Sequence, residues 1–248
     1  MRIHLAAGLL LAAALHAAEP LRFESGPSQV ALIELYTSEG CSSCPPADRW
    51  LGCLRDKPGL WREFVPVEFH VDYWNGLGWR DRLSSRDYTD RQYAYASVWG
   101  NPSVYTPCFV RNGAEWKPQW GGPAAAGGPG GSLSVEVAED GRCRARYRPA
   151  PGARAGAADY AVHVALLGGG VISRVTAGEN DGATLGHEFV VLGTASGSLA
   201  PGAAPGALQA TVMLPRSEVA GLKRRAIAVW VTRRNELIPL QATGGWLP

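Results

Sequence analysis

The sequence has no surplus of charge of either sign and, after its first residues, no long hydrophobic run. Its 24 lysine and arginine residues nearly balance 22 aspartate and glutamate residues, which gives a formal net charge of +2. Basic residues do not form a stripe interleaved with aromatic ones, so we expect no nucleic-acid surface. No later segment is apolar over the roughly 18 residues that a membrane-spanning helix needs. After removal of a leader, the protein is therefore expected to be soluble and to bind neither nucleic acid nor membrane.

The long apolar stretch that does exist lies at the N-terminus. A short basic start, Met1–His4, precedes the apolar run Leu5–Leu15, and small residues follow up to Ala18. This pattern is typical of a secretory signal peptide over residues 1–18, and its apolar core is too short to cross a bilayer. An uncleaved membrane anchor is the alternative. We expect an exported protein of the periplasm, with secretion from the cell as a second destination, and disulfides persist in both compartments.

Cysteine is scarce and odd in number. The chain has five, so at least one thiol stays unpaired or is shared with a partner. Cys41 and Cys44 form a Cys-x-x-Cys motif between an apolar, strand-like run at 30–36 and a helix-like segment at 47–55. A Cys-x-x-Cys at a strand-to-helix junction of a βαβ pattern is typical of a dithiol/disulfide site. The two intervening residues let the sulfurs close a disulfide and reopen it.

Hydrophobic patterning predicts an α/β first half with the order β-α-β-α-β-β. A second strand is expected at 64–72, a second helix opens at the capping-box pattern Ser84-x-x-Asp87 and ends at Gly100, and Asn112-Gly113 is typical of a hairpin turn. The glycine, proline and alanine tract at 121–132 predicts a linker. Beyond it, short strands separated by turn residues predict an antiparallel sandwich or barrel, with strands at 133–138, 143–148, 160–166, 188–192, 208–214 and 227–232.

Three stretches give the first half a family resemblance. They are LYTSEGCSSCPPAD at 35–48, FHVDYW at 69–74 and SVYTP at 103–107. With the element order, they resemble the thioredoxin-like fold, and more closely a secreted bacterial family with that fold that is catalogued as a domain of unknown function. Segment 178–182, together with His187, looks like the second part of that family. The resemblance supplies no reaction.

The resemblance implies a fold class and a domain division. The class is α/β, with a thioredoxin-like domain at 19–120, a linker at 121–132 and a smaller, mostly antiparallel, sandwich-like β domain at 133–248. It also implies that the Thr106-Pro107 bond is cis, faces the dithiol and receives the extended chain of a partner. The sequence departs from the pattern at Cys108, at the double proline after Cys44, and in the poor helix-forming tract where a closing helix is expected.

The dithiol chemistry assigns roles to the two cysteines. The thiolate is the attacking species, so the site must lower a thiol pKa from about 8.5, and a helix N-terminus favours that negative charge. Because proline fits the first helical turn, Pro45-Pro46 places Cys44 near the N-cap, with Cys41 in the preceding turn. We assign Cys41 as the attacking thiol, since the turn is expected to leave it more exposed, and Cys44 as the resolving thiol.

Other residues have two interpretations each. Glu34 interrupts the first strand and is either a buried proton acceptor for the resolving cysteine, by resemblance to thioredoxins, or an acid facing water at a strand edge. Cys108 is a partner of the dithiol, a third redox thiol or a soft metal ligand, or else a small buried apolar residue. His70 and Asp72 tune the thiols or bind metal, or are a hydrogen-bonded histidine and a turn aspartate.

The remaining cysteines are expected to be structural. Cys53 follows Cys44 by nine residues, which on a helix is about 13 Å of rise and the opposite face, so these two cannot pair. We expect Cys53 to be buried or to form a disulfide with Cys143.

The sequence as a whole predicts an exported thiol–disulfide oxidoreductase that uses Cys41 and Cys44, with Pro107, Glu34 and Cys108 in support. Its partner would be a protein or small thiol/disulfide substrate, and no cofactor and no metal site are expected. One alternative is a periplasmic Cu(I) or zinc protein with Cys41 and Cys44 as ligands, completed by Cys108 or His70. The other is a non-catalytic binding module whose disulfide is structural. No pattern indicates an oligomeric state.

Overall fold

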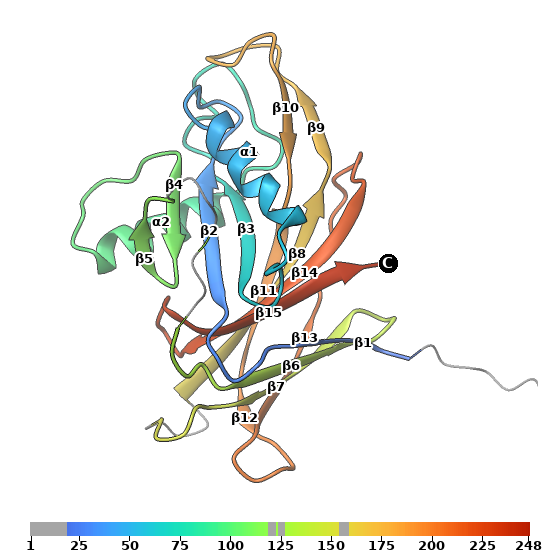
Figure 1. The fold of residues 1–248 in the computed structure, drawn as a ribbon. Helices are drawn as coiled ribbons and strands as arrows, with labels where there is room; N and C mark the ends of the chain where they lie inside the picture. Colours follow the sequence, from blue (N-terminus) through green and yellow to red (C-terminus); the bar gives the residue numbers. More distant parts are fainter. Residues whose placement is uncertain (1–18, 119–122, 124–126, 154–158) are drawn as a thin grey trace, which may run out of the picture.

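The described part of the chain is a mixed α/β structure with two large β-sheets, one containing parallel strands and one antiparallel (Figure 1). It is a computed structural model that describes residues 19–118, 123, 127–153 and 159–248. The predicted signal peptide at 1–18 and part of the predicted linker lie outside these residues. Among the described residues, no helix is both long enough and apolar enough to cross a membrane.

The larger sheet combines strands from both halves of the sequence. Its order is β15-β14-β8-β11-β3-β2-β4-β5, and β3 runs parallel to both β2 and β11. Because β11 follows the glycine-rich tract and β3 precedes it, one sheet continues across the boundary predicted at 121–132. The strands are β2 (Ala31–Thr37), β3 (Phe64–His70), β4 (Cys108–Arg111), β5 (Ala114–Trp116), β8 (Tyr160–Gly169), β11 (Val190–Ser198), β14 (Arg224–Arg233) and β15 (Pro239–Leu247).

The smaller sheet is antiparallel and has the order β1-β6-β7-β13-β12. Its first strand precedes the Cys-x-x-Cys motif and pairs with a strand from beyond the tract, a pairing that the local sequence pattern did not predict. The strands are β1 (Leu21–Glu24), β6 (Ser132–Val137), β7 (Arg142–Arg148), β12 (Ala200–Pro201) and β13 (Leu208–Met213). The predicted β-rich half thus divides its strands between the two sheets.

The alternation of β14 explains how the larger sheet is buried on both faces. Ile227, Val229 and Val231 pack into the core shared with the smaller sheet, whereas Ala228 and Trp230 pack into the core beneath the helices. Successive side chains of a strand point to opposite faces, so a near-continuous apolar strand is the pattern of a sheet covered on both sides. Each fully buried large apolar side chain contributes about 1.5–3 kcal/mol to folding.

The helices cover opposite faces of the β2–β3 region. Helix α1 (Pro45–Cys53), followed by the short 3₁₀ turn η1 (Leu54–Asp56), has Cys44 as its N-cap, as the double proline predicts. Helix α2 (Arg86–Val98) is capped by Ser85, whose hydroxyl accepts from the Asp87 N–H, so the cap predicted at Ser84 is wrong by one residue. On β2, Thr37 bonds to α1 and Glu34 to α2, as strand alternation requires.

A tight hairpin turn and a separate two-stranded ladder lie at opposite ends of the sheet. Asn112 and Gly113 both have positive φ, 48° and 84°, and join β4 to β5 in the predicted hairpin. At the opposite side, β9 (Val171–Arg174) and β10 (Thr184–His187) form a separate two-stranded ladder that packs on α1. The loop between them, residues 175–183, reaches the Cys-x-x-Cys segment. The strands β9 and β10 were not predicted.

Candidate functional site

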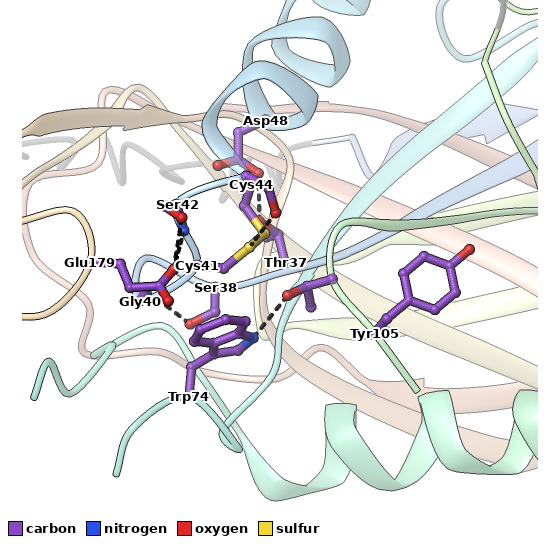
Figure 2. Close-up of a disulfide and its surroundings, with 12 residues drawn as sticks. Thr37, Ser38, Gly40, Cys41, Ser42, Cys44, Asp48, Trp74, Tyr105 and Glu179 are labelled. Carbon is purple, nitrogen blue, oxygen red and sulfur yellow. Dashed lines mark hydrogen bonds between the residues drawn. A yellow bond between two sulfur atoms is a disulfide. The ribbon is translucent and has the colours of Figure 1, made fainter. Parts of the chain in front are cut away.

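Cys41 and Cys44 form a disulfide between the end of β2 and the start of α1 (Figure 2). Their Cα atoms are 5.4 Å apart. The Cys44 carbonyl accepts the first helical hydrogen bonds, from the N–H groups of Ala47 and Asp48. The predicted geometry of a dithiol in the turn that opens a helix is therefore present.

Both sulfur-bearing residues are buried, which corrects the expectation that the turn leaves Cys41 exposed. Cys41 is 1% and Cys44 0% exposed. The β9–β10 loop is bonded to this segment: the Asn180 side-chain amide donates to the carbonyls of Glu39 (2.9 Å) and Cys41 (3.0 Å). The local sequence predicts an exposed turn, but a segment far along the chain is hydrogen-bonded to it.

A second contact from the same loop engages Ser42, one of the two residues between the cysteines. The Glu179 carboxylate accepts from the Ser42 N–H (3.0 Å) and from the Ser42 hydroxyl (2.7 Å), as Figure 2 shows. The two bonds hold the pKa of Glu179 below its usual value. The family resemblance of segment 178–182 did not indicate these long-range contacts.

The Thr106-Pro107 bond is cis, as the family resemblance implied. Strand β4 runs antiparallel to β2, and the pairing of Tyr36 with Cys108 brings this proline to the end of the sheet from which Cys41 emerges. The Thr106 hydroxyl accepts from the Trp74 indole N–H at 2.8 Å. Pro107 and the disulfide therefore belong to one end of the sheet.

Glu34 is fully buried, so the interpretation as an acid facing water is wrong. Its carboxylate accepts from the Arg91 guanidinium at 2.8 and 3.1 Å and from the hydroxyls of Tyr36 and Tyr95 at 2.9 and 2.6 Å. These partners lie on the face of the larger sheet that α2 covers, whereas α1, which begins after Cys44, covers the opposite face. Glu34 is thus engaged in an ion pair away from α1, and its contacts do not support exchange of a proton with Cys44.

The other cysteines are free thiols in this structure. Cys108 is buried, and burial raises its pKa to about 11, which agrees with a small apolar residue. Cys53 is exposed, and Cys143, on β7 of the smaller sheet, is buried. The expected burial of Cys53, or its pairing with Cys143, is wrong, because Cys53 lies on the exposed face of α1 while Cys143 points into the core between the sheets.

Asp48 stands one helical turn after Cys44 on α1. It is 3% exposed, and one of its oxygens accepts from the Thr37 hydroxyl at 2.6 Å. Burial, followed by the nearby charge of Glu68, raises the pKa of Asp48 to about 7. The sequence contains this residue in its Pro-Pro-Ala-Asp segment, yet nothing in the local pattern distinguishes a buried aspartate in a first helical turn from the common exposed one.

Asp48 borders a buried acid–histidine cluster. His70 and Glu68 come from β3, and His187 from the end of β10. Glu68 Oε1 lies 2.9 Å from His70 Nε2 and 2.8 Å from His187 Nδ1, and His70 Nδ1 lies 2.6 Å from Asp81 Oδ2. We use the name acid–histidine cluster for Glu39, Asp48, Glu68, His70, Asp81 and His187, which are all buried.

Except at Asp48, the resolved pKa shifts in the cluster favour the charged forms despite burial. Burial disfavours the imidazolium form of His70, but Asp81 and Glu68 outweigh it and raise the His70 pKa. The same balance, with Glu68 as the main partner, raises the pKa of His187. Burial by itself would raise the pKa of Glu68 and of Asp81, but the neighbouring histidines outweigh it, so both pKa values are lowered. His70 is thus hydrogen-bonded as one sequence interpretation expected, but inside a cluster that sequence spacing did not indicate.

Comparisons with known proteins identify relatives of known structure. The protein AGR_C_4864 from Agrobacterium tumefaciens, known from an X-ray crystal structure, is 26% identical; the match covers 90% of this chain and 96% of that chain, with a TM-score of 0.57. HBP35 of Porphyromonas gingivalis is 14% identical over 90% of this chain and 76% of that one, with a TM-score of 0.58. At that identity the second likeness concerns the fold alone. No curated protein matches the chain.

One family profile matches most of the sequence. The match extends over residues 32–232 and includes the Cys-x-x-Cys segment, β3 and the β9–β10 loop. The chain belongs to the family described as "Protein of unknown function (DUF1223)".

Proposed function

We propose that the protein is an exported thiol–disulfide oxidoreductase built on a thioredoxin-like first half, with Cys41 and Cys44 as its redox pair. The observation that carries the proposal is the Cys41–Cys44 disulfide at the β2–α1 junction, at the same end of the sheet as the cis Thr106-Pro107 bond. A disulfide that forms across a Cys-x-x-Cys turn, next to a helix N-terminus that stabilises a thiolate, is suited to reversible exchange.

The exchange requires no cofactor. In the reduced protein, the Cys41 thiolate attacks one sulfur of a substrate disulfide; that S–S bond breaks and the other substrate sulfur leaves as a thiolate. The Cys44 thiolate then attacks Cys41 Sγ and displaces the second substrate thiolate. Two electrons pass from the protein dithiol to the substrate, and the disulfide of Figure 2 is the oxidised product. The same steps in reverse oxidise a substrate dithiol.

The burial of both cysteines favours a second candidate, a binding module whose disulfide is structural. Cys41 is 1% exposed, so attack on its sulfur by another protein requires this segment to open, and the β9–β10 loop is bonded to it. Exchange therefore depends on release of the Asn180 and Glu179 contacts. The two candidates differ in the reduction potential of the same pair of cysteines.

The deciding experiment is measurement of that potential, by mass spectrometry of alkylated protein equilibrated in glutathione buffers. We expect a value between about −270 and −120 mV, the range of thioredoxin and the strong periplasmic oxidant. A Cys41→Ser/Cys44→Ser double variant is the control that separates this pair from the free thiols. A disulfide that stays closed below about −300 mV would overturn the proposal and favour the structural role.

A further inference from the structure

The acid–histidine cluster draws its side chains from segments far apart in the chain. Glu39 follows β2, Asp48 lies on α1, Asp81 precedes α2, and His187 ends β10. Burial of several ionisable side chains in one place is costly unless partners or a metal balance their charge. The cluster therefore needs an explanation beyond the packing of the surrounding strands.

Three of its side chains converge on one point. Candidate ligand atoms of Glu68, His70 and His187 all lie within 4.8 Å of one another. The two imidazole rings meet edge to face, with centroids 4.8 Å apart, and Glu68 Oε1 lies between their facing nitrogens. Two imidazole nitrogens and a carboxylate form a set that transition metals bind in proteins.

The outer nitrogen of each ring faces a further carboxylate. His70 Nδ1 lies 2.6 Å from Asp81 Oδ2, and His187 Nε2 lies 3.6 Å from Glu39 Oε1. Metal-binding histidines have this arrangement, because the carboxylate fixes the tautomer and orientation of the ring. Asp81 is itself held by the N–H groups of Glu39 and Leu83.

Several buried polar atoms of the cluster lack a hydrogen-bond partner among the described residues. Asp48 Oδ2 lies 4.0 Å from His187 Nδ1, beyond hydrogen-bond range. Together with Glu39 Oε1, Glu68 Oε2 and His187 Nε2, it has no hydrogen-bond partner among the described residues. A buried polar atom without a partner loses its hydration and gains nothing in return, so these atoms indicate that the cluster is incomplete without a further group.

The charges indicate the sign of the missing group. Four carboxylates contribute to the cluster, and their ion-pair partners within the described part of the chain are His70 and His187. Even if both rings carry a proton, the charges of Glu39, Glu68 and Asp81 exceed theirs by one, and ionisation of Asp48, whose pKa is raised to about 7, adds a second unbalanced negative charge. A divalent cation supplies the opposite charge.

We propose that Glu68, His70, His187 and Asp48 bind one divalent transition-metal ion of the Zn²⁺ type, with Asp81 and Glu39 as positioning residues for the two imidazoles. On binding, the metal replaces the protons between the rings and Glu68, and these protons leave to solvent. The mixed nitrogen and oxygen set favours Zn²⁺ over Cu(I), which selects thiolates. The inference is independent of the redox proposal, because no cysteine is a ligand.

The test uses the whole mature chain with its Cys41–Cys44 disulfide closed, so that these sulfurs cannot serve as ligands. The protein is unfolded in chelator, refolded with or without Zn²⁺, dialysed, and its metal content is measured by mass spectrometry. We expect about one equivalent of zinc and a Tm that rises with the zinc concentration. A zinc content below about 0.1 equivalent, with no change in Tm, would overturn the proposal.

Variants locate the site. His187→Gln and Asp48→Asn are expected to lose zinc, and Asp81→Asn to weaken its binding by about 10–100-fold. His163→Gln is the matched control, since His163 stacks on Trp230 away from the cluster, and should keep one equivalent. Retention of zinc in folded His187→Gln would contradict the assignment.

A spectroscopic readout keeps the test valid if the variants do not fold. Co²⁺ in place of zinc in the wild-type protein should give visible bands of nitrogen and oxygen coordination, and X-ray absorption should show imidazole scattering. Sulfur-to-cobalt charge transfer would instead identify a free cysteine as a ligand and reject the site. A protein that binds no metal would overturn this proposal only, because the reduction potential of Cys41 and Cys44 is measured separately.

Discussion

Asn180 donates its side-chain amide to the carbonyl of Cys41, 139 residues earlier in the chain. The same amide donates to the carbonyl of Glu39, so that one side chain bridges both ends of the turn that leads into the dithiol. Glu179 holds Ser42 on the other side. The β9–β10 loop is therefore bonded to the chain on both sides of Cys41, and we expect its movement to expose the disulfide.

Removal of the Asn180 amide should make the disulfide easier to reduce. Asn180→Ala deletes two neutral hydrogen bonds, each worth about 1 kcal/mol, so opening of the loop should become about 5–30 times more favourable. We expect the rate of reduction by dithiothreitol to rise by a similar factor, measured by alkylation at timed intervals. Gln209→Ala, an exposed amide on the smaller sheet, is the control, and an unchanged rate in Asn180→Ala would show that the loop does not limit access.

The roles of the two cysteines predict which variant retains a mixed disulfide. In a Cys53→Ser background, chosen because Cys53 is an exposed free thiol, Cys44→Ser leaves Cys41 without a resolving partner. We expect it to accumulate a glutathione adduct detectable by intact mass, while Cys41→Ser does not. The reverse result would assign Cys44 as the attacking thiol.

Loss of the Glu34 charge should destabilise the protein without changing the potential of the dithiol. Glu34→Gln leaves the Arg91 guanidinium buried without its counter-charge, which costs about 3–5 kcal/mol of unfolding free energy. Urea unfolding measures this loss. Because Glu34 bonds to the α2 face, the Cys41/Cys44 potential should stay the same.

The exposed Arg86–Asp90 pair provides a matched control for the Glu34 variant. Asp90→Asn removes a charge of the same sign from α2 and should change stability little, since solvent screens surface pairs. A shift in the dithiol potential of Glu34→Gln would restore the interpretation of Glu34 as a proton acceptor for Cys44.

His163 should make stability depend on pH in the acidic range. Burial, helped by the positive charge of Arg91, lowers the pKa of His163 to about 4. The unfolded chain binds this proton more readily, so the stabilisation is complete above about pH 6.5 and is lost as pH falls towards 4. Because the side chain is only partly buried, we expect a loss of about 1–2 kcal/mol rather than the roughly 3 kcal/mol of an unscreened shift.

The His163→Gln variant isolates this contribution. It removes the titrating ring that lies between Ser196 and Thr232. Urea unfolding of both proteins at pH 7 and pH 4.5 should show a steeper fall in unfolding free energy for the wild type. If the unfolding free energy falls equally in the two proteins, the pKa of His163 does not differ between the folded and the unfolded chain, and the prediction is wrong.

Local sequence patterns predicted correctly the features that depend on neighbouring residues in the chain. The double proline fixed Cys44 as the N-cap of α1, Asn112-Gly113 formed the β4–β5 turn, and apolar alternation located β2, β3 and most later strands within a few residues. Strands β1, β12 and β15 and the β9–β10 ladder were missed, because short strands, and strands interrupted by glycines as β15 is, have little periodicity of their own.

The sequence by itself therefore determined the dithiol, its place between a strand and a helix, and the turn chemistry around it. Only the tertiary structure decided that β11 pairs with β3 and brings His187 to Glu68, and that Asn180 closes over Cys41. The physical reason is that burial and partner choice arise from contacts over a hundred residues apart. The sequence does not distinguish a buried charged side chain from an exposed one. A buried charge needs partners, and the fold brings them together.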